Sequence, residues 1–122
     1  MLLGLRTVIY PVGKELDKAR DWYTQVAGLE PYFVEPFYVG FAIGGFELGL
    51  QPEDGASTQG PEPLWGVADA EAAFQRLLQL GATALSPVTE VGEGIKVAAV
   101  RDPFGNRLGI IENPHFDPLK VG

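Results

Sequence analysis

The sequence contains no cysteine and a single histidine, His115, among its 122 residues. The lack of cysteine excludes disulfide bonds, thiolate nucleophiles and cysteine-ligated zinc sites. No apolar run approaches the roughly 18 residues that a membrane span needs, and the N-terminal apolar stretch is too short for a secretion signal. We therefore expect a cytoplasmic protein with no membrane partner.

Positive charge is also scarce, because nine Lys and Arg face 16 Asp and Glu, for a net charge of -7. An acidic surface repels phosphate backbones, so nucleic acid is not an expected partner. Such a surface could weakly attract a cationic ligand, although net charge mainly keeps a protein soluble. With 46% hydrophobic and 20% charged residues, the composition predicts that residues 1–122 form one globular domain.

The first half of the chain predicts a strand, a helix and three more strands. Leu16, Ala19, Tyr23 and Val26 recur at helical spacing between charged residues, and Gly28 marks the end of that helix. Apolar, β-branched runs separated by glycine turns predict the strands. The expected elements are a strand over 5–12, a helix over 14–27, and strands over 30–34, 38–43 and 46–51.

The same order begins again after a polar stretch, PEDGASTQGPEP, whose composition is typical of a linker. Asp69 is a suitable helix N-cap and Gly81 a suitable stop. Strands are expected over 64–67, 83–88, 95–101 and 107–112, and the segments FELGLQ and NRLGII align without a gap.

This order predicts a duplicated α+β domain, with a first βαβββ module at about 4–51, a linker at 52–63, a second module at about 64–113 and a tail at 114–122. A chance match between small α+β patterns is the alternative.

Three segments carry a family resemblance: VIYPVGKELDKARDWYTQVAGLEP at 8–31, GVADAEAAFQRLLQLGA at 66–82 and RDPFGNRLGIIE at 101–112. The chain resembles the vicinal oxygen chelate superfamily of glyoxalases, bleomycin-resistance proteins and extradiol dioxygenases. The resemblance implies that the two modules form an open, cup-like mixed sheet with the helices outside, and that the chain forms a homodimer. Because members include both metal enzymes and metal-free binding proteins, the fold leaves the function open.

The resemblance also implies four positions that hold a divalent ion in metal-using members. In this sequence they are Thr7, Gly49, Glu62 and Gly109. Glu62 alone offers a carboxylate, Thr7 is a weak oxygen donor, and glycine has no side chain.

The residues lead to the same expectation without the resemblance, because catalytic transition-metal sites generally use about three His, Cys or carboxylate ligands. Hard-ion binding by Glu47, Glu62 and Glu112 is chemically allowed, but strand alternation turns Glu112 away from the side of Gly109. We expect no metal ligands and no cofactor, with a divalent metal the disfavoured alternative.

If Gly49 and Gly109 point into the cup, alternation places a set of candidate ligand-binding residues on the same inner face. They are Thr7, Ile9, Glu47, Gln51, Glu62 and Arg107. The opposite set, which includes Leu48, Leu50, Leu108 and Ile110, would pack against the helices. A mostly apolar cavity with a few polar groups is typical of a small-molecule site, and the two glycines are expected to leave room for the ligand.

Several of these residues have two possible roles. Glu47 and Arg107 could bind a polar ligand group, but pairing with each other is favoured because a buried charge is costly alone. Glu62 is the candidate catalytic residue as a general base, or a solvated acid at the end of the linker. The aromatic residues Phe37, Tyr38, Phe41 and Trp65 could stack on a flat ligand, although core packing is the more common role.

The leading hypothesis is a metal-independent protein that binds a small molecule in the cup. The alternative is an enzyme of the same superfamily, either a metal-dependent lyase or dioxygenase with atypical ligands or an isomerase. A third hypothesis is an assembly or regulatory module with an empty cup.

Overall fold

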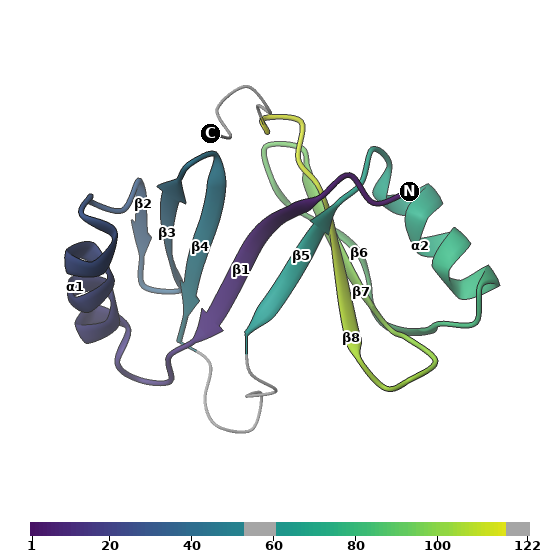
Figure 1. Cartoon of the computed structure of the whole chain (residues 1–122), viewed down its shortest axis with the longest axis horizontal. Helices are drawn as coiled ribbons and strands as arrows, with labels where there is room; N and C mark the ends of the chain where they lie inside the picture. Colours follow the sequence, from purple (N-terminus) through teal and green to yellow (C-terminus); the bar gives the residue numbers. More distant parts are fainter. Residues whose placement is uncertain (53–60, 117–122) are drawn as a thin grey trace. The chain divides into compact units, whose positions relative to one another are not determined.

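The computed structural model describes residues 1–52 and 61–116 (Figure 1). They divide into two compact units, which we call the N-terminal unit (Thr7–Glu62) and the C-terminal unit (Met1–Arg6 with Pro63–Phe116). Strand β1 (Leu5–Pro11) begins in the C-terminal unit and continues into the N-terminal unit. None of the helices in the described ranges is long and apolar enough to cross a membrane.

In the N-terminal unit one helix packs on a four-stranded mixed sheet. Its elements besides β1 are α1 (Leu16–Ala27), β2 (Phe33–Glu35), β3 (Tyr38–Ile43) and β4 (Phe46–Gln51). The strand order is β2-β3-β4-β1, with β1 parallel to β4 and the other neighbours antiparallel. The first module therefore has the predicted βαβββ order.

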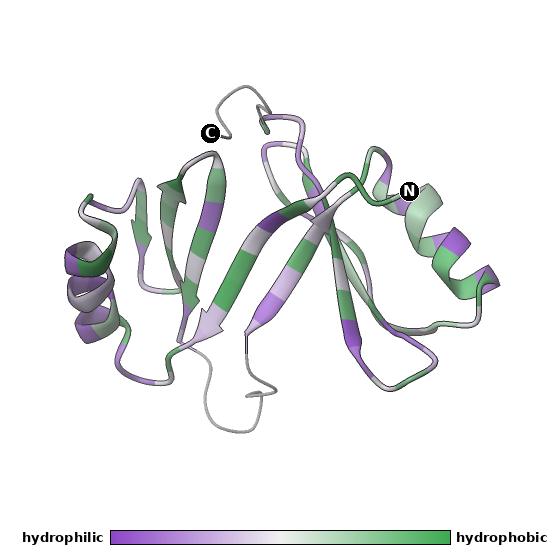
Figure 2. Ribbon diagram, in the orientation of Figure 1, coloured by the Kyte–Doolittle hydropathy of each residue, from purple (hydrophilic) through white to green (hydrophobic). Residues whose placement is uncertain are grey.

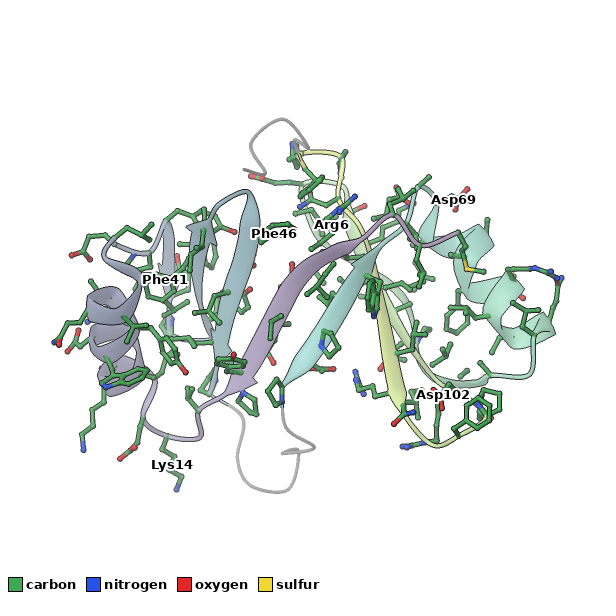
Figure 3. The ribbon with its side chains drawn as sticks, in the orientation of Figure 1. Arg6, Lys14, Phe41, Phe46, Asp69 and Asp102 are labelled. Carbon is green, nitrogen blue, oxygen red and sulfur yellow. The ribbon has the colours of Figure 1, made fainter. Side chains whose placement is uncertain are left out.

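The core of this unit lies between the sheet and α1. Leu16 of the helix packs with Val39, Phe41 and Leu50 of the sheet, and all four are buried. Figure 3 shows Phe41 in this layer. Because side chains alternate along a strand, residues 48 and 50 face the helix while 47, 49 and 51 face the other way, and Figure 2 shows the alternation along β4.

The C-terminal unit repeats the arrangement. Its elements are β5 (Glu62–Gly66), of which only Glu62 is counted with the N-terminal unit, α2 (Ala70–Gln79), β6 (Thr83–Gly92), β7 (Ile95–Arg101) and β8 (Arg107–Glu112). The order is β5-β8-β7-β6, with β5 parallel to β8. Ala73 and Phe74 of α2 pack on Val100 and Ile110 of the sheet. The predicted α+β fold of two βαβββ modules is confirmed.

The start of α2 is held from two sides. The carboxylate of Asp69 accepts a hydrogen bond from the Ala72 N–H at 3.1 Å, and the carboxylate of Glu112 accepts one from the Ala70 N–H at 2.8 Å. Figure 3 shows Asp69 at this end of the helix. Two orphan amides at the helix N-terminus thus gain acidic partners, which the helix dipole also favours.

Some boundaries differ from those predicted. Helix α1 begins at Leu16 rather than at 14, because Gly13 adopts a left-handed backbone (φ 62°) that turns the chain first. Strand β2 covers Phe33–Glu35 rather than 30–34, as Pro31 lacks an N–H for the ladder. Strand β6 runs to Gly92 rather than 88, because shifts in its register with β7 let the pairing continue. Most of the predicted linker lies outside the described residues.

Candidate functional site

Two glycines lie side by side on the face of the N-terminal sheet opposite α1. Gly40 of β3 and Gly49 of β4 are direct partners across the antiparallel ladder. A Cβ atom on Gly49 would lie 2.6 Å from Cζ of Tyr38, and one on Gly40 would lie 3.1 Å from ring atoms of both Tyr32 and Tyr38. The two tyrosine rings therefore occupy the space that side chains at 40 and 49 would need.

The two tyrosines converge on one carboxylate. The hydroxyl of Tyr32 donates to one carboxylate oxygen of Glu47, and the hydroxyl of Tyr38 donates to the other. Burial, the negative charge of Glu47 and the hydrogen bond to it raise the pKa of Tyr38 far above its ordinary value. Tyr38 therefore keeps its proton, and remains a hydrogen-bond donor to Glu47, throughout the physiological pH range.

Two phenylalanines extend this group along β2 and the turn after it. The ring of Phe33 lies 6.1 Å from that of Tyr38 and 6.3 Å from that of Tyr32, and Phe37 lies 6.2 Å from Phe33. These are tilted or edge-to-face pairs, the arrangements that aromatic quadrupoles favour. We call the five residues Tyr32, Phe33, Phe37, Tyr38 and Glu47 the Glu47 cluster.

The structure brings four of the predicted residues onto the face that carries this cluster. Glu47 pairs with Thr7 of β1 in the parallel ladder, Ile9 pairs with Gly49, and Gln51 follows on the same side of β4. Thr7 is buried, whereas Ile9, Glu47 and Gln51 are half-buried. The predicted alternation is confirmed in this unit, since Leu48 and Leu50 pack on the helix side.

Glu62 and Arg107 are the first residues of β5 and β8. Glu62 is half-buried and Arg107 is exposed, and each takes part in interactions of its own. The predicted pairing of Arg107 with Glu47 and the general-base role of Glu62 stay predictions. Leu108 and Ile110 of β8 pack against the core of α2, as their alternation predicts.

The expectation that Gly49 and Gly109 leave room for a ligand is wrong. The ring of Tyr38 fills the space at Gly49, and a Cβ on Gly109 would lie 2.6 Å from Cδ2 of Leu64 and 2.9 Å from the carbonyl oxygen of Pro63. Contacts this close mean that any side chain at either position would displace its neighbours. The glycines make room for the protein's own groups, because neighbouring strands bring those groups over them.

Two other candidate metal ligands, Glu112 and His115, each contact a backbone group in a different part of the C-terminal unit. Glu112 turns to the helix side and binds the Ala70 N–H, as strand alternation predicts. The His115 ring lies 2.9 Å from the Glu93 carbonyl oxygen through its Nε2. In the described part of the chain no three His, Asp or Glu side chains gather in a way that could hold a metal ion. At the four positions where the resemblance implies metal ligands, the chain offers one carboxylate, that of Glu62, one hydroxyl and two glycines, and the expectation of no bound metal stays a prediction.

The four aromatic residues singled out as stacking candidates have different environments. Phe41 is fully buried under α1, so its role is core packing. Trp65 is the partner of Ile110 in the parallel ladder, so its side chain lies on the face of the sheet that carries α2. Phe37 and Tyr38 belong to the Glu47 cluster.

Tyr32, Phe33 and Gly40 were not among the residues predicted from the sequence. The available signal was the pair of glycines in adjacent strands, flanked by aromatic residues, since glycine inside a strand often marks the close approach of another group. The register that places Gly40 opposite Gly49 follows from the Gly44-Gly45 turn between β3 and β4.

Two open hollows also occur in the N-terminal unit, both beside α1. The larger, of about 830 Å³, lies between the start of α1 and the turn after β2 and includes Lys14, Glu35 and Val39 in its lining. The other is lined by Arg20, Glu30 and other residues along the helix. Neither includes a member of the predicted inner face.

Comparison with known families identifies the family of the chain. A model described as the Glyoxalase/Bleomycin resistance protein/Dioxygenase superfamily matches residues 9–110. No curated protein is similar enough in sequence to match the chain.

Solved structures share the fold at low sequence identity. A glyoxalase/bleomycin resistance protein/dioxygenase superfamily member from Vibrio splendidus 12B01 has a TM-score of 0.67 at 17% identity, covering 89% of this chain and 99% of its own. Methylmalonyl-CoA epimerase has a TM-score of 0.70 at 15% identity, covering 93% and 97%. Homoprotocatechuate 2,3-dioxygenase from Brevibacterium fuscum has a TM-score of 0.68 at 17% identity, covering 92% of this chain and 33% of its own.

Proposed function

The chain belongs to the glyoxalase/bleomycin resistance protein/dioxygenase superfamily, and from this premise we propose that it binds a small organic molecule without using a metal ion. The binding surface is the face of the N-terminal sheet opposite α1, where Thr7, Ile9, Glu47 and Gln51 lie together. This face carries a few polar groups among apolar and aromatic ones, which is the usual make-up of a small-molecule site.

One observation supports metal independence above the others. The resemblance implies that Gly49 and Gly109 occupy positions where metal-using members carry ligand side chains, and neighbouring groups fill the space beside both glycines. Thr7 and Glu62 would then be the only donors from these positions. Two such oxygen donors fall short of the three or more protein ligands that a catalytic metal generally needs.

Metal content tests this part of the proposal. Protein purified without chelators should contain far less than one divalent ion per chain, and its melting temperature should not change after EDTA treatment. Elemental analysis by mass spectrometry provides the measurement. One tightly held divalent ion per chain would overturn metal independence.

Ligand binding is tested by a thermal-shift screen of metabolites and antibiotics in metal-free buffer. A ligand present at 100 times its Kd should stabilise the folded protein by about 2.7 kcal/mol. The hits should lose their effect in a Glu47→Gln variant but keep it in Glu90→Gln, which removes an exposed carboxylate from the other unit. A broad screen without hits would contradict the proposal and favour the assembly-module hypothesis.

A further inference from the structure

We propose that the Glu47 cluster recognises an organic cation, a ligand that carries a protonated amine or a quaternary ammonium group beside an apolar or aromatic body. This inference rests on the proposed small-molecule function and narrows it to one class of ligand. It is carried by the combination of one carboxylate with four aromatic rings on a single face of the N-terminal unit.

Glu47 supplies the negative charge. An ionised carboxylate has about four acceptor positions, and the hydroxyls of Tyr32 and Tyr38 use one on each oxygen. The ion pairs found in the described residues of this unit join Lys18 to Glu15 and Arg20 to Asp21. Within this unit, the partners that hold Glu47 in place are thus neutral hydroxyls, which orient its carboxylate and carry no opposite charge.

The aromatic rings supply the second recognition element. A cation near the face of a Phe or Tyr ring is attracted by the negative potential of that face. Tyr32 and Phe37 are 62% and 65% exposed, and Phe33 is 38% exposed, so their ring surfaces are accessible. Aromatic rings are the groups by which proteins generally recognise quaternary ammonium ligands, and the carboxylate of Glu47 adds an attraction between opposite charges.

The same features disfavour the other classes of ligand. An anion would be repelled by Glu47 and by the net charge of -7. A neutral ligand of equal shape would gain the ring contacts but no Coulomb attraction to the carboxylate. The cluster should therefore select by charge first and by shape second.

Three probes that share a phenyl ring and differ in charge test this selectivity: benzyltrimethylammonium, benzyl alcohol and phenylacetate. Calorimetric or NMR titration of the full chain should give a Kd for benzyltrimethylammonium at least tenfold lower than for the other two. Chemical shifts of residues 32–38 and 47 should change with that cation. Raising the salt concentration should weaken its binding, because the attraction is electrostatic in part.

Substitutions test whether the cation binds at the Glu47 cluster. Glu47→Gln should lower the affinity for benzyltrimethylammonium at least tenfold, whereas the matched Glu90→Gln should leave it unchanged. Phe33→Leu and Phe37→Leu keep an apolar side chain but lose the ring, so each should lower the affinity several-fold. If Glu47→Gln does not fold, the two Phe variants test the binding site instead.

The outcomes separate this inference from the proposed function. Equal or tighter binding of benzyl alcohol or phenylacetate would overturn the cation inference and leave small-molecule binding intact. Cation binding that survives both Phe variants and Glu47→Gln would place it elsewhere and overturn the assignment to the cluster. If none of the three probes binds, the inference fails, and the thermal-shift screen then decides the broader proposal independently.

Discussion

At position 49 the absence of a side chain allows Tyr38 to reach Glu47. The tyrosine ring lies over the glycine backbone, and its hydroxyl donates to the carboxylate on the same face. Glycine inside a strand normally destabilises the strand, because glycine loses more conformational entropy on folding than other residues and has no side chain to pack. Here that cost is offset by a hydrogen bond to a charged group, a kind that contributes about 1.5–3 kcal/mol.

The effect of Gly49→Ala should therefore depend on Tyr38. In the wild-type background the new methyl group displaces the tyrosine, and the free energy of unfolding should fall by about 1–3 kcal/mol. In a Tyr38→Ala background the same change should raise it by about 0.5 kcal/mol, because alanine is favoured over glycine where space allows. Urea unfolding of the four proteins measures this cycle. Equal effects in both backgrounds would contradict the packing of the Tyr38 ring over Gly49.

Tyr38 also predicts a dependence on alkaline pH. Burial and the nearby charge of Glu47 raise the pKa of Tyr38 above its ordinary value of 10.0. Above about pH 10 the unfolded chain releases this proton while the folded protein keeps it, so the stabilisation is present below that pH and is lost as the pH rises.

The comparison that checks this dependence is with Tyr38→Phe. Between about pH 9 and about pH 11, the free energy of unfolding should fall less steeply in Tyr38→Phe than in the wild type. At neutral pH the variant should be less stable by about 1.5–3 kcal/mol, the value of the lost hydrogen bond to a charged group. Parallel pH profiles of the two proteins would show that Tyr38 titrates normally.

Among the elements, the two helices differ in how their first turns are held. Helix α2 has Asp69 as an N-cap and Glu112 of β8 on its first amide. Helix α1 follows Glu15, whose side chain makes no capping hydrogen bond. The connection through Glu112 ties the end of the last strand to the start of α2, so the two elements stabilise each other.

Replacing Glu112 should loosen this connection by a measurable amount. Glu112→Ala should lower the free energy of unfolding by about 1 kcal/mol, as for the loss of a helix cap. Glu112→Gln keeps an oxygen acceptor and should cost only a few tenths of a kcal/mol. Thermal unfolding by circular dichroism measures both variants. An Ala variant as stable as the Gln variant would show that the hydrogen bond contributes nothing.

For the whole molecule, β1 joins the two units, because Leu5 and Arg6 belong to one unit and Thr7 onward to the other. Each unit has its own helix-covered core. A unit of about half this chain's length is close to the size at which a core alone is barely sufficient for stability. We therefore expect the units to unfold together.

The two tryptophans can report on this cooperativity, since Trp22 lies in the N-terminal unit and Trp65 in the C-terminal unit. Single-tryptophan variants made by Trp65→Phe and Trp22→Phe should show the same urea midpoint by fluorescence as by circular dichroism. Two separate midpoints would mean that each unit is stable alone.

The pattern of the sequence was sufficient for the repeated βαβββ order and for the division of each sheet into two faces. Strands 38–43, 46–51, 95–101 and 107–112 have the predicted bounds. The reason is that both features depend on local periodicity, since alternation along a strand and a 3.6-residue repeat along a helix are carried by neighbouring residues. Positions 48 and 50 were thereby assigned to the helix side.

The tertiary structure decided what fills the space above each glycine. Gly40 and Gly49 are nine positions apart in the chain (49 − 40 = 9), and only the register of β3 with β4 sets them side by side. The rings of Tyr32 and Tyr38 then cover both and meet at Glu47. Such contacts depend on side-chain directions across separate strands, which no periodicity within one strand records.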